Sequence, residues 1–160
     1  MSSIVYPPHK SSIGNIDANI ISFLAYLIPI LLVGSPALKY LVWIAPLIMY
    51  FVERDSGLVK FHAMQSFVIN AICNVINFVI SVVISGLFFV NPIIKSNNIS
   101  SFLSLGFTGI IGFLMGLITF GVSIAVFVFS IISIINAYKY NEYEIPFINL
   151  ITEKIKKYIK

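Results

Sequence analysis

The residues that could carry out chemistry are concentrated in one polar stretch between long apolar runs. The cluster Glu53, Arg54 and Asp55 precedes His62 and Gln65, which lie one helical turn apart at the head of an apolar run. Because an imidazole titrates near neutral pH, this arrangement suits a proton relay or a substrate gate at a membrane surface. The alternative is structural: His62 and Gln65 tie a loop down by hydrogen bonds while the charged side chains remain solvated.

The rest of the chain offers few catalytic groups. One cysteine and two histidines exclude an intrachain disulfide and a Cys/His zinc set built from one chain. Cys73 lies in an apolar run, where a thiol usually packs as a small hydrophobe. The sequence contains no Ser/His/Asp set, pair of inward carboxylates or Gly-rich phosphate loop. We therefore expect a protein that is not an enzyme and needs no cofactor or metal.

The composition indicates that lipid is the solvent for much of the chain. Hydrophobic residues make up 59% of the 160 residues and charged residues only 10%, whereas about a quarter of a soluble domain is charged. The net charge of +4 is small and scattered, which argues against nucleic acid as a partner. We expect an all-α polytopic membrane protein in the lipid bilayer.

Charge-free runs predict four transmembrane helices within one domain, residues 16–146. The predicted helices cover about residues 17–34, 37–52, 58–91 and 102–138. The second run is short for a hydrocarbon core of about 30 Å, so a short or re-entrant hairpin over residues 17–52 is the alternative. The fourth run exceeds one crossing, and we expect a Gly-rich lead-in at Gly106 and Gly109 before a helix from about residue 110. Asp17 or Asn19 is expected to cap the first helix.

The two ends of the chain differ from this apolar domain. Residues 1–15 are polar, contain Pro and Gly, and predict a flexible tail. Residues 147–160 predict a basic amphipathic helix on a membrane surface, particularly over anionic lipid, with a solvated tail as the alternative. Its apolar face would carry Ile148, Ile151, Ile155 and Ile159, and its flanks Lys154, Lys156, Lys157 and Lys160.

The distribution of basic residues predicts the orientation. With four crossings, one side collects Lys10, Arg54, Lys60, Lys139, Lys154, Lys156, Lys157 and Lys160, and the other side Lys39 and Lys95. By the positive-inside rule, both termini and the central loop lie in the cytoplasm. We therefore expect a multi-pass protein of a bacterial-type cytoplasmic (inner) membrane.

The third predicted helix carries a stripe of polar side chains. At about 100° per residue these side chains occupy an arc of roughly 140°. The stripe comprises His62, Ser66, Asn70, Asn74, Asn77, Ser81 and Ser85. It is either a hydrogen-bonding seam between helices or the wall of a polar cavity, because polar groups in a membrane normally face protein or water.

Small side chains form a groove on the fourth predicted helix, within an arc of about 60°. The groove comprises Gly112, Gly116, Thr119, Ser123, Ser130 and Ala137. Small residues let helix backbones approach closely in membranes. The groove therefore suits either the polar stripe of the third helix or self-association into an oligomer.

Two segments resemble a known family. Residues 46–65, PLIMYFVERDSGLVKFHAMQ, are similar to the Tic-type small membrane proteins, in which a charged loop is followed by F-H-A-x-Q at the head of a helix. Residues 135–146, INAYKYNEYEIP, resemble the family's A-x-K-x-G-E-Y-x-x-P end, with Asn141 where Gly is usual. Asn also tolerates a left-handed turn. The resemblance covers about residues 17–151, and relatives include uncharacterised bacterial proteins, magnetosome membrane proteins and the membrane subunit of chloroplast protein import.

The resemblance implies a four-helix fold and an important F-H-A-x-Q turn, but it carries no transport activity to this chain. We expect a non-enzymatic scaffold or an accessory subunit of a membrane assembly, as a homo-oligomer or with other membrane subunits. The alternative is a channel or translocation component with a polar path along the third helix.

Overall fold

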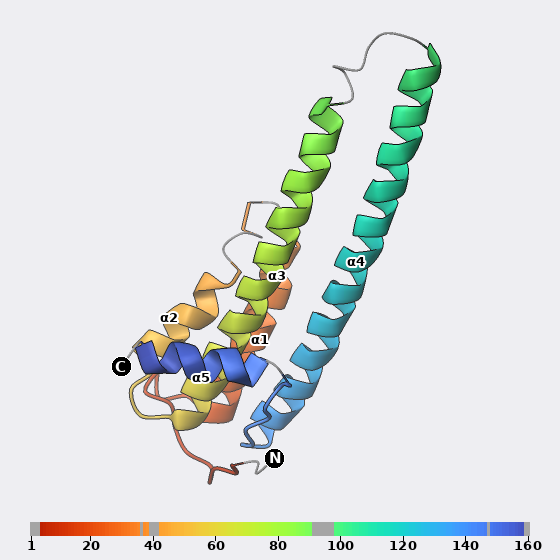
Figure 1. The fold of residues 1–160 in the computed structure, drawn as a ribbon. Coiled ribbons are helices and arrows are strands. Elements are labelled where there is room, and N and C mark those ends of the chain that lie inside the picture. The colour runs from red at the N-terminus through yellow and green to blue at the C-terminus, as the bar shows by residue number, and fades with distance from the viewer. Residues whose placement is uncertain (1–3, 36, 39–41, 91–97, 147, 159–160) are drawn as a thin grey trace. The chain divides into compact units, whose positions relative to one another are not determined.

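The computed structural model describes residues 4–35, 37–38, 42–90, 98–146 and 148–158. These residues form five helices and no strands (Figure 1). The helices are α1 (Ala18–Val33), α2 (Ile44–Val52), α3 (Gly57–Val90), α4 (Asn98–Tyr138) and α5 (Ile148–Tyr158). The all-α prediction is confirmed.

Two helices in the described part of the chain, not four, are long and apolar enough to cross a membrane. These candidate spans are Gly57–Leu87 in α3 and Gly106–Tyr138 in α4. α1 has 16 residues and α2 only 9, and a crossing needs about 20 residues. The prediction of four spans is therefore wrong, because α1 and α2 are each too short for a crossing. The short-hairpin alternative agrees with α1 and α2, which pack against each other.

α4 is longer than the sequence predicted. It begins at Asn98 and continues through Gly106 and Gly109 to Tyr138, so these glycines lie inside the helix and not in a separate lead-in. Each helical glycine costs roughly 1 kcal/mol relative to alanine. In lipid that cost is smaller than leaving backbone N–H and C=O groups without partners, which favours a continuous helix.

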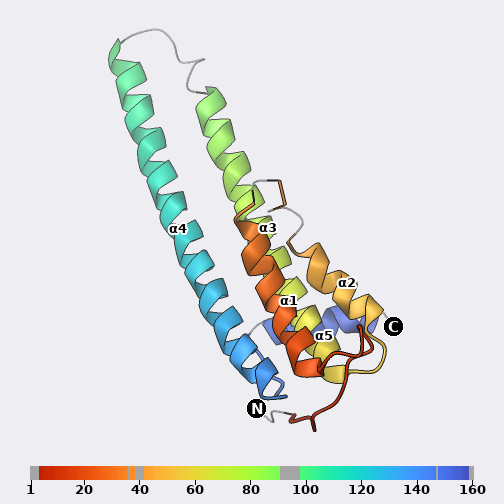
Figure 2. The same cartoon turned by 180° about the vertical axis from the view of Figure 1, so that it is seen from behind.

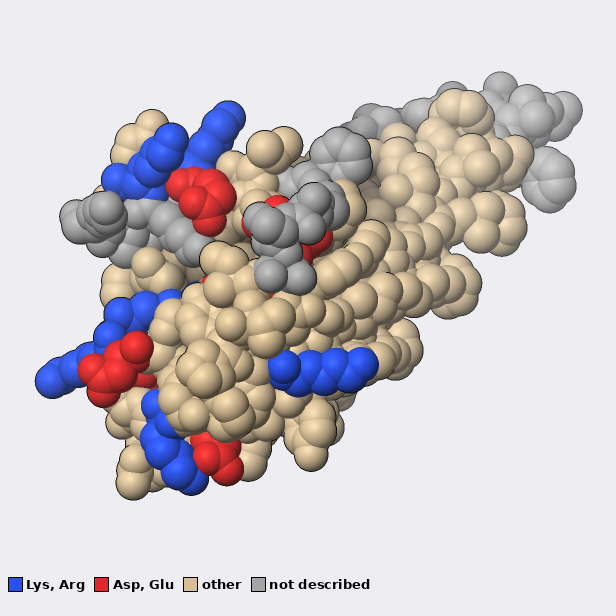
Figure 3. Space-filling model, turned by 90° about the horizontal axis from the view of Figure 1, so that it is seen from below, with Lys and Arg blue, Asp and Glu red and all other residues tan. Residues whose placement is uncertain are grey.

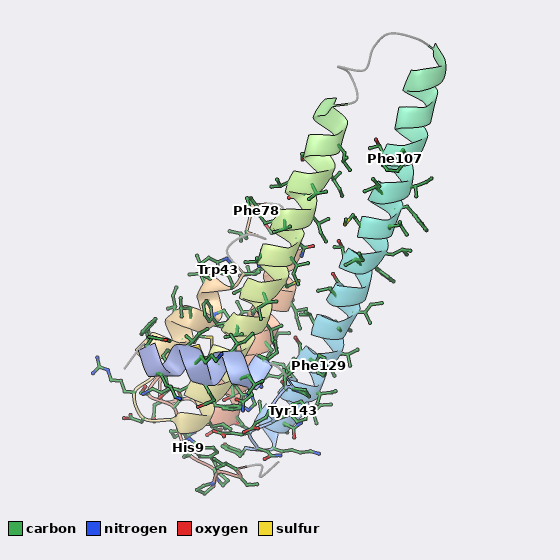
Figure 4. The ribbon with its side chains drawn as sticks, viewed as in Figure 1. His9, Trp43, Phe78, Phe107, Phe129 and Tyr143 are labelled. Carbon is green, nitrogen blue, oxygen red and sulfur yellow. The ribbon has the colours of Figure 1, made fainter. Side chains whose placement is uncertain are left out.

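The chain divides into two compact units, residues 1–72 with 126–160, and residues 73–125. In the first unit, α1, α2 and α5 lie around the first half of α3 in both views (Figure 1, Figure 2). One apolar cluster joins Ala18 and Ile21 of α1 to Leu58 and Val59 of α3. A second cluster is formed by Tyr26, Ile69 and Ile145, with Phe129 and Tyr143 packed against it (Figure 4).

The second unit exposes large apolar side chains. Phe78, Phe107, Phe113 and Phe120 are all exposed, and Figure 4 labels the first two. An apolar surface of this kind is expected where helices face lipid or other membrane helices.

The sequence-based orientation stays a prediction. Lys39 and Lys95, which define the opposite side, lie outside the described residues, as do Phe147, Ile159 and Lys160 of the C-terminal segment.

Asp17 precedes α1 as its N-cap but makes no side-chain cap; its carboxylate pairs with Lys10 at 2.6 Å. Asn19 does not cap α1 either, because its amide donates to the carbonyl of Tyr138 at 3.2 Å.

Candidate functional site

The F-H-A-x-Q turn forms the buried start of α3. Phe61, His62 and Gln65 are 5%, 0% and 1% exposed, respectively. His62 and Gln65 contribute polar groups to an otherwise apolar interior, and the ring of Phe61 packs edge-on against that of His62. Such groups require hydrogen-bond partners, because an unpaired buried polar group costs about 1–3 kcal/mol.

His62 and Gln65 find these partners in two other parts of the chain. The hydroxyl of Tyr26 in α1 donates to Gln65 Oε1 at 2.7 Å and lies 3.1 Å from His62 Nδ1. His62 Nε2 donates to the carbonyl of Asn141 at 3.1 Å, and Gln65 Nε2 donates to the carbonyl of Tyr143 at 2.9 Å. We call His62, Gln65, Tyr26 and the two carbonyls the polar clamp, because they join α1, α3 and residues 141–143.

The hydrogen positions in the clamp follow from its acceptors. A carbonyl oxygen can only accept, so His62 Nε2 carries a proton and Gln65 points its amide nitrogen at Tyr143. With a neutral imidazole, the one hydroxyl proton of Tyr26 serves two acceptors, Gln65 Oε1 and His62 Nδ1. The shorter contact, to Gln65, takes the larger share of that proton.

The acidic cluster and the clamp have separate sets of contacts. Glu53 is 2% exposed and accepts hydrogen bonds from the N-terminal segment and from the turn before α3. Its donors are the Ser11 hydroxyl, the Ser12 backbone and hydroxyl, and the backbone N–H groups of Asp55 and Ser56. Arg54 and Asp55 are exposed. The set that would make a proton relay is thus divided between a structural carboxylate, the exposed loop and the clamp.

The surroundings of Glu53 keep its carboxylate charged. Burial by itself raises the pKa of a carboxyl group, but the hydrogen bonds from Ser11, Ser56 and Ser12 outweigh it and lower the pKa to about 2. The charged form is therefore tied to the docked N-terminal segment.

The N-terminal segment is held at further points. The Tyr6 hydroxyl donates to Glu142 at 2.8 Å, and backbone bonds link Tyr6 to Tyr140 and Glu142 to Ile4. Burial and the bond to the Glu142 carboxylate raise the pKa of Tyr6 to about 12. Described residues among 4–15 thus make specific hydrogen bonds, and the flexibility of this segment stays a prediction. Its polar composition reflects hydrogen bonding to Glu53 and Glu142.

The polar stripe of α3 changes character along the helix. His62 and Ser66 are buried and bond to other elements, Ser66 to the carbonyl of Ala25 at 2.7 Å. Asn70 and Asn77 instead donate to carbonyls of their own helix, those of Ser66 at 2.8 Å and Cys73 at 2.9 Å. This back-bonding gives each amide nitrogen a partner within α3. Asn74 also makes a polar interaction.

The small-residue groove of α4 is open in the second unit. A Cβ atom added at Gly112 or Gly116 would meet nothing within 4 Å. Thr119 and Ser123 bond to carbonyls of their own helix, and Ser130, which belongs to the first unit, is buried. A role of the groove in helix packing remains a prediction.

Sequence reasoning missed Tyr26, Ser11, Ser12, Tyr6 and Glu142. A tyrosine within an apolar helix is a signal for a buried hydroxyl that needs a partner. The described residues contain no group of three His, Cys, Asp or Glu side chains that could hold a metal ion.

Comparisons with known proteins give one match. A family model described as the magnetosome magnetite crystal formation protein family matches residues 17–151. No curated protein and no solved structure matches the chain. The match supports the magnetosome part of the resemblance and a membrane location, whereas the Tic-type name stays a prediction.

Proposed function

We propose, from the premise that the chain belongs to the magnetosome magnetite crystal formation protein family, that it is a non-enzymatic accessory subunit of a membrane assembly. The observation that carries this proposal is the polar clamp. His62 and Gln65, the most chemically capable pair in the sequence, are buried and bonded to Tyr26 and to two backbone carbonyls. These hydrogen bonds fix α1 and the segment after α4 on α3.

The proposal assigns assembly to the small-residue groove of α4. Gly112 and Gly116 lie on one helix face, and the space beside each of them is open. Membrane helices associate through such faces because their backbones can approach closely there. The exposed aromatic side chains of the same unit would contribute packing area to a partner helix.

A matched pair of glycine variants tests the groove. Gly116 and Gly121 are both open to added side chains, but at about 100° per residue they point to opposite sides of α4. We expect Gly116→Leu to lower the yield of crosslinked oligomers or co-purified membrane subunits in native membranes, and Gly121→Leu to leave it unchanged. Equal yields from the two variants and the wild type would contradict an assembly role of this groove.

The alternative function, a channel or translocation component, depends on water along the α3 stripe. The side-chain amides of Asn70 and Asn77 donate to carbonyls of their own helix, which favours a stripe without an aqueous path. A cysteine-accessibility scan along α3 distinguishes the two functions.

A further inference from the structure

The outer face of α5 combines exposed apolar and basic side chains. Leu150, Ile151 and Tyr158 are 68%, 40% and 90% exposed, and Lys154 and Lys157 are exposed as well. At about 100° per residue these five side chains fall within an arc of roughly 120°. Long aliphatic lysine stems that end in charges, interleaved with apolar side chains, are typical of a helix at a membrane surface.

The inner face of α5 is occupied by the protein. Ile148 packs against the cluster of Tyr26, Ile69 and Ile145. Thr152 is buried, and its hydroxyl donates to the carbonyl of Ile148 at 3.0 Å. The sequence assigned the isoleucine stripe to the membrane, but its first member faces the protein core. The face available to the membrane is therefore the outer face, which combines apolar and basic side chains.

The anchor of α5 places this outer face near the edge of the bilayer. Ile69 lies in the candidate span Gly57–Leu87. That span has 31 residues, about 11 more than one crossing needs, and the charged and polar side chains Lys60, His62 and Gln65 lie at its first end, which assigns the surplus to that end. α5 is thus attached to α3 close to the boundary between hydrocarbon and headgroups, and Figure 1 shows it lying across the first half of α3.

We propose that the outer face of α5 is a docking surface for anionic lipid headgroups. Lys154 and Lys157 bind the phosphate oxygens, and Leu150, Ile151 and Tyr158 enter the outermost acyl region. Each lysine near an anionic surface adds attraction that is lost in a neutral bilayer. Figure 3 shows Lys and Arg side chains gathered with acidic ones on the face seen from below. The one acidic residue of α5, Glu153, is exposed beside this face, so Lys154 and Lys157 leave a net positive charge there.

A second copy of the chain is the competing occupant. Symmetric dimers bring the same patch of both subunits together. Such a contact would set Lys154 and Lys157 of one copy against the same lysines of the other, with Glu153 as the one acidic residue of α5 beside them. Charge complementarity therefore favours an anionic bilayer.

A nitroxide at position 150 of the full-length chain tests the proposal. The Leu150→Cys, Cys73→Ala protein is labelled and placed in nanodiscs of phosphatidylcholine, alone or with one third phosphatidylglycerol. Depth is measured by power saturation with oxygen and with a water-soluble nickel chelate. We expect lipid embedding in the anionic discs and greater nickel accessibility in the neutral ones. Asp55→Cys in the same background, at an exposed loop position, should face water in both.

Charge variants make the test specific. Lys154→Gln with Lys157→Gln should shift the ratio of embedded to water-exposed label by roughly thirtyfold toward water in anionic discs. Equal embedding in both lipids, or no effect of the lysine variants, overturns headgroup recognition. Spin–spin broadening between labels in discs that hold two copies overturns it in favour of a dimer contact. Because all these side chains are exposed, the inner face of α5 is unchanged in every variant.

Discussion

The hydroxyl of Tyr26 in α1 donates a 2.7 Å hydrogen bond to the side-chain oxygen of Gln65 in α3. Both side chains are almost fully buried. The Gln65 amide passes the connection on to the carbonyl of Tyr143. One side chain of the F-H-A-x-Q turn thus holds a helix and a distant loop at once, which gives Gln65 a structural role in this turn.

Removing the hydroxyl should destabilise the protein. Tyr26→Phe keeps the ring but leaves Gln65 Oε1 and His62 Nδ1 without their donor, which should lower the free energy of unfolding by about 1–3 kcal/mol. Chemical unfolding in detergent micelles, followed by circular dichroism, measures this change. Tyr138→Phe, at an exposed tyrosine, is the control and should change stability by less than about 0.5 kcal/mol. Equal effects of the two variants would contradict the clamp.

The Glu53 carboxylate should make stability depend on acid pH. Its pKa falls from 4.5 to about 2 on folding, so it contributes about 3 kcal/mol above about pH 4.5. That contribution is lost as the pH falls toward 2, because the unfolded chain then binds the proton more readily than the folded one. The difference in free energy of unfolding between wild type and Glu53→Gln, measured from pH 2 to 7, should therefore shrink toward low pH.

Asp55→Asn is the matched control, because Asp55 is the exposed acid of the same loop. Its difference from the wild type should stay near zero throughout the range. A Glu53→Gln difference that is constant between pH 2 and pH 7 would show that the hydrogen bonds from Ser11 and Ser12 do not require the charge.

Hydropathy predicted α3 and α4 closely because lipid requires long apolar helices. The predicted ranges 58–91 and 102–138 compare with Gly57–Val90 and Asn98–Tyr138. Hydropathy overestimated the length of the first two helices, since a charge-free run does not reveal that α2 starts at Ile44. The end of α1 at Val33 agrees with the predicted range 17–34.

Only part of the polar clamp could be predicted from the sequence. His62 and Gln65 were identified by type and spacing, and their structural role was one of the two readings. Their partners are not visible in sequence, because Tyr26 is 36 residues from His62 and the Asn141 carbonyl is 79 residues away. Backbone acceptors carry no side-chain signature, so tertiary folding alone brings them together.

The turn after α4 also differs from what the sequence suggested, and it gives another prediction. The N–H of Asn141 bonds to the carbonyl of Asn136 and that of Tyr140 to Ala137, the pattern of a Schellman motif. The left-handed residue is Tyr140, with φ 58°, and not Asn141 as its place in the family pattern suggested. Because a side chain costs about 1–2 kcal/mol in this conformation, Tyr140→Gly should be more stable than Tyr140→Ala by about 1 kcal/mol.

Comparing Gly with Ala removes the effect of losing the ring, which packs near His9 and the first apolar cluster. The same pair of substitutions at Lys139, which does not have a positive φ, is the control. There Ala should be equal to or more stable than Gly. Thermal unfolding in detergent ranks the four variants, and the same ranking at both positions would contradict strain at Tyr140.

Cysteines along the α3 stripe should report whether it is dry. In a Cys73→Ala background, Asn70→Cys, Asn74→Cys and Asn77→Cys are treated with a membrane-impermeant maleimide in native membranes, with Asp55→Cys as the exposed control. Because Asn70 and Asn77 bond to their own helix, we expect labelling at least tenfold slower than at position 55, even after the membranes are opened to expose both sides. Inaccessibility would favour the accessory subunit, since a water-filled path would leave these positions reactive. Rapid labelling of all three would instead show that water reaches the middle of α3, and the translocation function would then replace the one proposed.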